Sequence, residues 1–262
     1  EKSNLSELDE KIKTICVPST AGTGAETTQF STIWDKSKGL KYSIVSNKLN
    51  RTIILDPELS LYLPNQITIT TGIDALCQLL ESTWSNKADK FSAKSAKLGY
   101  QILKDNLVNT INSPQNEESR LSMLISSYLS GISISKANTT LCHSISYPLT
   151  ALIGIPHGLA CGLTLIETIR FNSKDNDKFL KNTLKATNHI YSKDLINEVE
   201  DLFKKINFEK QLQFFIPILE RSLNKILPLT INSSRANNNP FKAEIEDINH
   251  IIEKSINRVK NS

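Results

Sequence analysis

The sequence predicts a chain of the α/β plus all-α class, in which a short β-rich segment leads into a longer helical domain. Two patterns in the 262 residues support this division. Within residues 1–60, short runs of apolar and β-branched residues alternate with turn residues, which is typical of strands. From residue 61 to residue 262, apolar residues recur at spacings of three and four, which is typical of amphipathic helices. We therefore expect an N-terminal α/β part over residues 1–60 and a helical domain over residues 61–262.

The composition is that of an ordinary globular protein and argues against several functional classes. Hydrophobic residues make up 39% of the chain and charged residues 22%. The net charge of +4 is small, and the basic residues are interspersed with acidic ones, so a nucleic-acid partner has little support. Because no apolar run approaches the ~20 residues that a membrane span requires, we expect no membrane partner either.

Four cysteines are spread along the chain, with neither a CxxC pair nor the dense spacing of a disulfide framework. They are Cys16, Cys77, Cys142 and Cys161. Thiols that stay reduced are typical of cytoplasmic proteins. We therefore expect a cytoplasmic location.

The β-rich segment contains several short runs that read as strands. We predict strands over residues 13–18, 29–34, 40–45 and 52–55, the last of which ends at Asp56-Pro57. Short strands without crossover helices cannot cover both faces of a sheet. We therefore expect that a larger N-terminal α/β portion of the fold is missing from this chain.

A turn rich in glycine and hydroxyl residues follows the first predicted strand. It runs Ser19-Thr20-Ala21-Gly22-Thr23-Gly24 and continues into Glu26-Thr27-Thr28. Backbone amides and hydroxyls in such a turn suit contacts to phosphate or ribose. An ordinary strand-to-helix turn uses the same residues, and the sequence matches no standard dinucleotide fingerprint.

The helical domain begins with a run that could be capped by Thr70 or Thr71. Ile73, Leu76 and Leu80 then follow at helical spacing. We predict further helices over residues 91–107, 117–135, 178–190, 195–206 and 245–259.

Asp74 and Gln78 lie four residues apart on the first predicted helix and therefore share one face. A carboxylate and an amide oxygen on one face could bind a cation together. The alternative is that Asp74 caps the first turn of the helix and Gln78 is solvated.

His143 and His157 lie fourteen residues apart, with Pro148 and Pro156 between them, so one straight helix cannot carry both. We expect His143 late in one helix and His157 in the turn that opens the next. A histidine in such a turn suits metal ligation, although a hydrogen bond to a local carbonyl is the alternative. His189 and His250 lie in charged amphipathic runs and are expected to face solvent.

Together these stretches resemble the iron-dependent, or group III, alcohol dehydrogenases. The order and spacing of four segments carry the resemblance, which extends from about residue 12 to the C-terminus: Pro18-Ser19-Thr20-Ala21-Gly22-Thr23-Gly24-Ala25-Glu26, Asp56-Pro57-Glu58-Leu59, Thr71-Gly72-Ile73-Asp74-Ala75-Leu76 and Ile155-Pro156-His157-Gly158. The resemblance implies a dehydroquinate synthase-like fold of two domains. A nucleotide-binding α/β domain, of which residues 1–60 would be the remainder, faces a helical domain across a cleft that holds metal and substrate.

The resemblance also implies the site. Asp74, His143 and His157 would ligate the metal, with Fe(II) as the family default and Zn(II) as an ion that fits the same ligands. The nicotinamide cofactor, NAD(H) or NADP(H), would be lined by Ser19, Thr20, Thr23, Thr32 and Lys41. The glycine-rich pyrophosphate loop of the family has no counterpart here, which supports the expectation of a missing N-terminal half.

Three departures from the family pattern indicate a branch within it. Gln78 stands where most members have a fourth ligand, a histidine, and would be a weaker ligand or none. Tyr147 stands in place of a second active-site histidine, and Lys136 in place of an asparagine. The runs around Gln78 and Tyr147 resemble the phosphonoacetaldehyde reductase branch.

We therefore expect a metal-dependent oxidoreductase that transfers a hydride between NAD(P)H and a small aldehyde, with phosphonoacetaldehyde and 2-hydroxyethylphosphonate as the substrate pair. Tyr147 or a chain of waters would supply the proton. Lys136 lies about two helical turns before His143, where its charge would attract a phosphonate, unless it extends to solvent. The alternatives are a general short-chain alcohol dehydrogenase and a truncated chain without activity of its own. A homodimer would be in keeping with the family.

Overall fold

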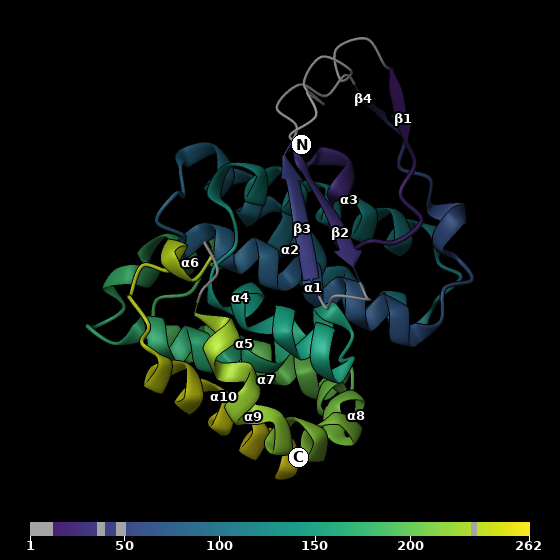
Figure 1. Cartoon of the computed structure of the whole chain (residues 1–262). Coiled ribbons are helices and arrows are strands. Elements are labelled where there is room, and N and C mark those ends of the chain that lie inside the picture. The colour runs from purple at the N-terminus through teal and green to yellow at the C-terminus, as the bar shows by residue number, and fades with distance from the viewer. Residues whose placement is uncertain (1–12, 36–39, 46–50, 232–234) are drawn as a thin grey trace, which may run out of the picture.

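The computed structural model describes residues 13–35, 40–45, 51–231 and 235–262, and within residues 32–44 it describes only the backbone of two strands. Figure 1 shows a thick body of helices that carries two small pairs of strands on one side. The expectation of a short β-rich segment followed by a helical domain agrees with this order of elements. No helix within the described ranges combines the length and the apolar character needed to cross a membrane.

The strands form two separate pairs. β1 (Thr14–Cys16) lies parallel to β4 (Arg51–Ile53), and β2 (Phe30–Asp35) lies antiparallel to β3 (Leu40–Val45). Their positions agree with the strands expected from the sequence to within a few residues. The β2–β3 pair crosses the helical body, whereas the β1–β4 pair extends away from it (Figure 1).

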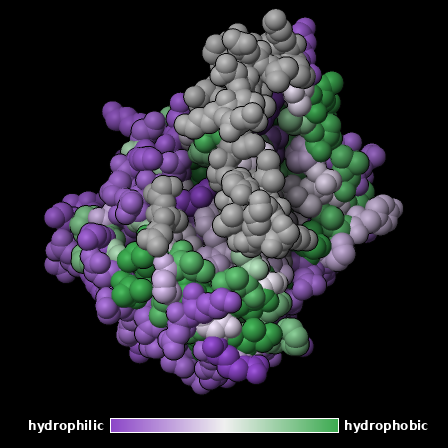
Figure 2. All heavy atoms as spheres, viewed as in Figure 1, coloured by the Kyte–Doolittle hydropathy of each residue, from purple (hydrophilic) through white to green (hydrophobic). Residues whose placement is uncertain are grey.

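The β1–β4 pair carries exposed apolar side chains. Ile15 is 66% exposed and Ile54 is 48% exposed, and Figure 2 shows hydrophobic atoms along this arm. Parallel strands are normally covered by helices on both faces. The expectation that further α/β structure packs against this pair stays a prediction.

Helix α1 (Asn65–Trp84) is the central element of the helical body. It packs against α2 (Lys90–Asn112), α3 (Glu117–Ala137) and α5 (His157–Ser173). All of its residues from position 72 to position 84 are buried, so its polar residues in that stretch have protein partners rather than solvent. A central helix of this kind can place several polar side chains at one interior point.

The predicted start of α1 at Thr70 or Thr71 is wrong. The helix begins at Asn65, directly after Pro64, and the Thr71 hydroxyl donates a hydrogen bond to the carbonyl oxygen of Ile67 at 2.9 Å. A threonine that bonds back to the preceding turn belongs to the interior of a helix. Asp74 therefore lies in the third turn and does not cap the helix.

Helix α4 (Leu141–Pro148) continues into a π-helical turn over Leu149–Ile153, and α5 follows after Gly154. His143 was expected late in a helix, but it lies in the first turn of α4. The expectation for His157 is confirmed, because it is the first residue of α5. Gly154, with a φ of 82°, provides the left-handed residue that ends the π-helical turn.

Of the remaining helices, α6 lies at the left side of the body in Figure 1 and the others form its lower part, with an apolar core around Phe203 and Phe208. They are α6 (Lys181–Thr187), α7 (Ser192–Lys205), α8 (Phe208–Leu212), α9 (Ile216–Thr230) and α10 (Ile245–Lys260). Of the two histidines expected to face solvent, His250 does so. His189 does not, because its side chain is only 13% exposed and lies 3.7 Å from Glu198.

Candidate metal centre and cleft

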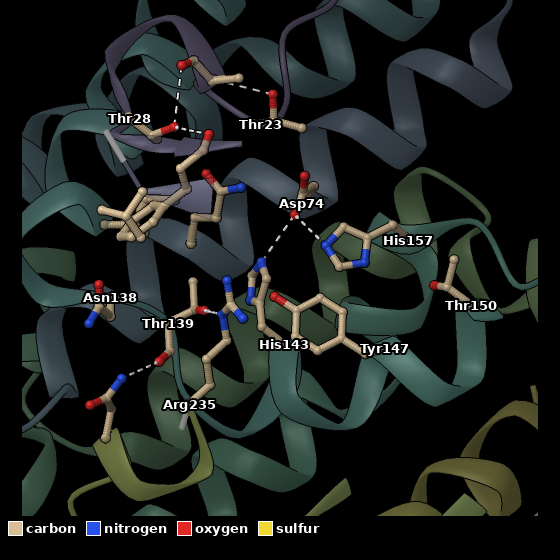
Figure 3. A pocket seen from close by; sticks show the side chains of 16 residues that line it. Thr23, Thr28, Asp74, Asn138, Thr139, His143, Tyr147, Thr150, His157 and Arg235 are labelled. Carbon is tan, nitrogen blue, oxygen red and sulfur yellow. Dashed lines mark hydrogen bonds and ion pairs between the residues drawn. The ribbon is translucent and has the colours of Figure 1, made fainter. Parts of the chain in front are cut away.

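A cleft of about 480 Å³ opens between the N-terminal segment and the helical body. Its lining residues come from segments far apart in the sequence, and Figure 3 shows their side chains converging. They are Thr23, Ala25, Thr28, Phe30, Val45, Asp74, Gln78, Ile134, Asn138, Thr139, His143, Tyr147, Thr150, His157, Arg235 and Asn238.

At the base of the cleft, three of the predicted ligands meet. The Oδ1 atom of Asp74 lies 3.2 Å from Nε2 of His143 and 3.9 Å from Nε2 of His157. Figure 3 shows the carboxylate pointing between the two imidazole rings. Asp74 comes from α1, His143 from α4 and His157 from α5, so the structure brings together three helices at this point.

A fourth donor atom, which the sequence reasoning missed, belongs to Cys161. Its sulfur lies 3.8 Å from Nε2 of His157, and the ligand atoms of Asp74, His143, His157 and Cys161 all lie within 4.8 Å of one another. One carboxylate oxygen, two imidazole nitrogens and one thiol sulfur are a donor set that suits a divalent transition metal. The signal in the sequence was the spacing of four between His157 and Cys161, which puts both on one helical face.

Close packing of α5 on α1 explains why His157 reaches Asp74. A Cβ atom added to Gly158 would lie 1.9 Å from the carbonyl oxygen of Thr70. Only a residue without a side chain lets the two helices approach this closely at the start of α5. Gly158 therefore sets the separation between Asp74 on α1 and His157 on α5.

Glu81, which the sequence reasoning also missed, orients His143. It is fully buried, and its Oε1 atom accepts hydrogen bonds from the backbone N–H of Thr140 at 3.1 Å, the Thr140 hydroxyl at 2.8 Å and the N–H of Cys142 at 2.8 Å. Its Oε2 atom pairs with Nδ1 of His143. A carboxylate only accepts hydrogen bonds, so Nδ1 of His143 carries a proton, and Nε2, which lies beside Asp74, is the nitrogen left to ligate a metal.

Gln78 lines the cleft beside Asp74. Its Oε1 atom accepts a hydrogen bond from the hydroxyl of Ser130 at 2.8 Å, and its amide group hydrogen-bonds the carboxylate of Asp74. The reverse orientation would aim the amide oxygen at that carboxylate. Gln78 is therefore a hydrogen-bond partner of Asp74, and its role as a metal ligand stays a prediction.

The charged groups in the cluster shift one another's pKa values. Burial acts to raise the pKa of Asp74, but the hydrogen bond from His143 and the charge of His157 hold it below its usual value. Burial acts to lower the pKa of His143, but the negative charges of Cys161 and Glu81 raise it well above its usual value. For Cys161, the two histidines outweigh burial and lower the thiol pKa to about 7. A cation bound here would take the place of the protons on these groups.

Tyr147 and Arg235 form the side of the cleft next to the cluster. The Tyr147 ring stacks on the ring of His157, with centroids 5.8 Å apart and an interplanar angle of 6°. The Arg235 guanidinium lies 4.8 Å from the centre of the Tyr147 ring and donates a hydrogen bond from Nε to the hydroxyl of Thr139 at 3.0 Å. Burial raises the pKa of Tyr147 to about 12, so the phenol keeps its proton at neutral pH.

Lys136 does not reach this cleft. Its side chain is exposed, and its charge acts on Asp89 instead. The expectation assumed that Lys136 and His143 share a helix, but α3 ends at Ala137 and Asn138 adopts a φ of 58°. The two residues therefore lie on different helices. Among the lining residues that the structure describes, Arg235 is the positively charged one.

The residues expected to line a cofactor are only partly brought to the cleft. Thr23 lines it, whereas Ser19 is exposed and neither Ser19 nor Thr20 is among the lining residues. Thr32 lies in β2 and Lys41 in β3, but their side chains fall outside the part of the chain that the structure describes.

The chain is similar to known proteins in family, sequence and structure. A model of the C-terminal part of the Fe-containing alcohol dehydrogenase family matches residues 68–256, and a model of iron-containing alcohol dehydrogenases matches residues 2–57. The phosphonoacetaldehyde reductase of Streptomyces viridochromogenes is 35% identical over 162 residues, which is 62% of this chain and 41% of that protein. The 1-propanol dehydrogenase of Salmonella typhimurium is 36% identical over 160 residues, 61% of this chain and 43% of that protein. The chain thus spans about four tenths of the length of these relatives.

Solved structures show the same arrangement of helices and strands. The sulfoacetaldehyde reductase of Bifidobacterium kashiwanohense, in complex with NAD+, superposes with a TM-score of 0.83 at 28% identity and covers 92% of this chain and 64% of its own. A 1,3-propanediol oxidoreductase superposes with a TM-score of 0.84 at 24% identity and covers 92% of this chain and 65% of its own. These likenesses confirm the predicted fold class.

Proposed function

The chain belongs to the iron-containing alcohol dehydrogenase family, and from this premise we propose that it forms the metal-binding and substrate-facing part of an NAD(P)-dependent reductase of small aldehydes. The observation that carries the proposal is the convergence of Asp74, His143 and His157 at the base of the cleft. Donors of these types hold divalent metals in catalytic sites that keep one position open.

In this proposal, Asp74, His143 and His157 hold the metal, and Glu81 fixes the imidazole of His143 for that task. When bound, Fe(II) or Zn(II) polarises the carbonyl oxygen of the aldehyde, and the nicotinamide supplies the hydride. The partly exposed side of His157 marks where the substrate oxygen would lie, because its side chain is 33% exposed whereas those of Asp74 and His143 are 5% exposed.

Tyr147 is the proposed proton donor. Its ring stacks on His157, which places the phenol beside the cluster. Burial holds its pKa near 12, so the group is protonated at neutral pH and can give its proton to the substrate oxygen as the carbonyl becomes an alcohol. The nearby Arg235 lowers the pKa of this phenol, which opposes burial and makes the proton easier to release.

We further propose that the substrate carries an anionic group, as phosphonoacetaldehyde does. Arg235 supports this, because its guanidinium lines the cleft and contacts two neutral side chains, Thr139 and Tyr147. A guanidinium beside hydroxyl and amide side chains suits a phosphonate or sulfonate. The names of two relatives, phosphonoacetaldehyde reductase and sulfoacetaldehyde reductase, agree with this choice.

The test compares kcat/KM for phosphonoacetaldehyde and for propanal in the protein that carries this chain. Any loss through Tyr147 is shared by both substrates, so Arg235→Ala should lower kcat/KM for the phosphonate by roughly 10- to 150-fold more than for propanal, the value of a charged hydrogen bond of about 1.5–3 kcal/mol. Lys136→Ala is the matched control, because it removes a positive charge outside the cleft.

A general short-chain alcohol dehydrogenase is the second candidate, favoured by the similarity to 1-propanol dehydrogenase. Equal loss for both substrates in Arg235→Ala, or a higher kcat/KM for propanal in the unmodified protein, would establish it instead. An assay of nicotinamide-dependent turnover by the 262-residue chain alone would decide whether this chain is sufficient for activity.

A further inference from the structure

Cys161 is the one member of the four-residue cluster to which the proposed function gives no role. It follows His157 by one helical turn on α5 and faces the same side. Its side chain is fully buried, and its sulfur lies 3.8 Å from Nε2 of His157. A buried cysteine by itself is often only a small core residue. Here, however, the sulfur lies with three other ligand atoms.

We propose that the thiolate of Cys161 is the fourth protein ligand of the metal centre and that it takes the place expected for Gln78. The inference rests on the proposed function, because it concerns the same metal. It makes the site an Asp–His–His–Cys centre for a borderline divalent ion such as Zn(II) or Fe(II).

The distances fit a single bound cation. In a tetrahedral site, bonds of ~2.3 Å to sulfur and ~2.05 Å to nitrogen place those two atoms about 3.6 Å apart. The corresponding Cys161 to His157 distance is 3.8 Å. An oxygen and a nitrogen ligand would lie about 3.4 Å apart, and Asp74 lies 3.2 Å from His143 and 3.9 Å from His157. These three separations are close to those of a coordination shell, and all four donor atoms lie within 4.8 Å of one another.

Ligand chemistry supports the thiolate over the amide. Thiolate sulfur is a common protein ligand of Zn(II) and Fe(II), whereas a neutral amide oxygen is a weaker and harder donor. Gln78 is also already engaged through its oxygen with Ser130.

The test uses the metal-free 262-residue chain, kept reduced, with Co(II) as a spectroscopic probe. A thiolate bound to Co(II) gives an intense sulfur-to-metal charge-transfer band in the near ultraviolet, which oxygen and nitrogen ligands do not give. We expect one Co(II) per chain and this band in the unmodified protein. Cys161→Ala should remove the band and weaken Zn(II) binding by about 100-fold or more, since even outer partners of ligands account for 10- to 100-fold.

The control is Cys77→Ala, which removes another fully buried thiol that lies outside the four-residue cluster and should leave the band unchanged. Gln78→Ala should also keep the band. Binding of Co(II) without the band, or a band that persists in Cys161→Ala, would overturn the proposal while leaving the metal site of the proposed function intact. If the unmodified chain binds neither Co(II) nor Zn(II), the proposed function itself fails.

Discussion

Replacing Glu81 by glutamine tests how the metal centre is oriented. In the structure, Oε1 accepts three hydrogen bonds from Thr140 and Cys142, and Oε2 faces the N–H of His143. In Glu81→Gln, the amide oxygen keeps the three bonds only if the amide nitrogen faces Nδ1 of His143. Two donors would then oppose each other. The opposite orientation is less favourable, because the amide nitrogen would then face the three donor groups of Thr140 and Cys142.

The imidazole can relieve this conflict only by moving its proton to Nε2, the atom that lies 3.2 Å from Asp74. A protonated Nε2 cannot ligate a metal. We expect Glu81→Gln to weaken Zn(II) binding by about 10- to 100-fold, or roughly 1.4–2.8 kcal/mol, which is the typical value of an outer partner of a ligand.

The measurement is a competition titration of Zn(II) against a chromophoric chelator at constant pH. Glu198→Gln serves as control, because it changes a carboxylate that accepts from Tyr100 and Lys104 outside the cleft. The role of Glu81 in selecting the tautomer of His143 is refuted if Glu81→Gln binds Zn(II) with a dissociation constant within about twofold of that of the unmodified chain.

Three further predictions concern stability, measured by urea denaturation of the chain. Gly158→Ala should lower the free energy of unfolding by about 1–3 kcal/mol, because its methyl group would meet the Thr70 carbonyl oxygen at 1.9 Å; an unchanged midpoint would contradict the close packing. Burial and the hydrogen bond to Glu198 raise the pKa of Tyr100 in the folded protein. The contribution of this hydroxyl to the free energy of unfolding is therefore complete below the unfolded pKa of ~10 and is lost as the pH rises above it. Stability should therefore fall above pH ~10 by up to about 1.4 kcal/mol per pH unit from this group, and Tyr100→Phe should remove that part of the slope. Phe203→Ala should cost about 3–5 kcal/mol because the ring is fully buried, whereas Phe214→Ala, at a side chain that is 76% exposed, should cost no more than ~0.5 kcal/mol.

The strands and most of the helices could be predicted from periodicity, but the exceptions have physical reasons. Helix α9 was not predicted. It contains Pro217 and Pro228, but Pro217 lies in the first turn of the helix, where the missing N–H costs nothing. The start of α1 was placed too late because Thr70 and Thr71 resemble caps, and only the packed structure shows that Thr71 bonds back to the preceding turn.

The candidate site was predictable as a set of ligand types but not as a network. Each of Asp74, His143 and His157 had an alternative role when considered alone. Only the resemblance to a known family indicated that the three bind one metal together. Lys136 was misplaced because a single left-handed residue, Asn138, separates two helices, and spacing along one helix could not reveal it. Glu81 and Cys161 stand at helical spacing from Asp74 and His157, yet which of many such neighbours faces the ligands depends on how three helices pack.

The ligands come from α1, α4 and α5, and Asp74 is 69 residues from His143 along the chain. A cation held by them would act as a crosslink that closes a long loop containing α2 and α3. Because the unfolded chain could not hold the ion in this way, metal at a thousand times its dissociation constant would add about 4 kcal/mol to the stability of the native state. Loss of the ion would then lower the stability of the native state by the same amount.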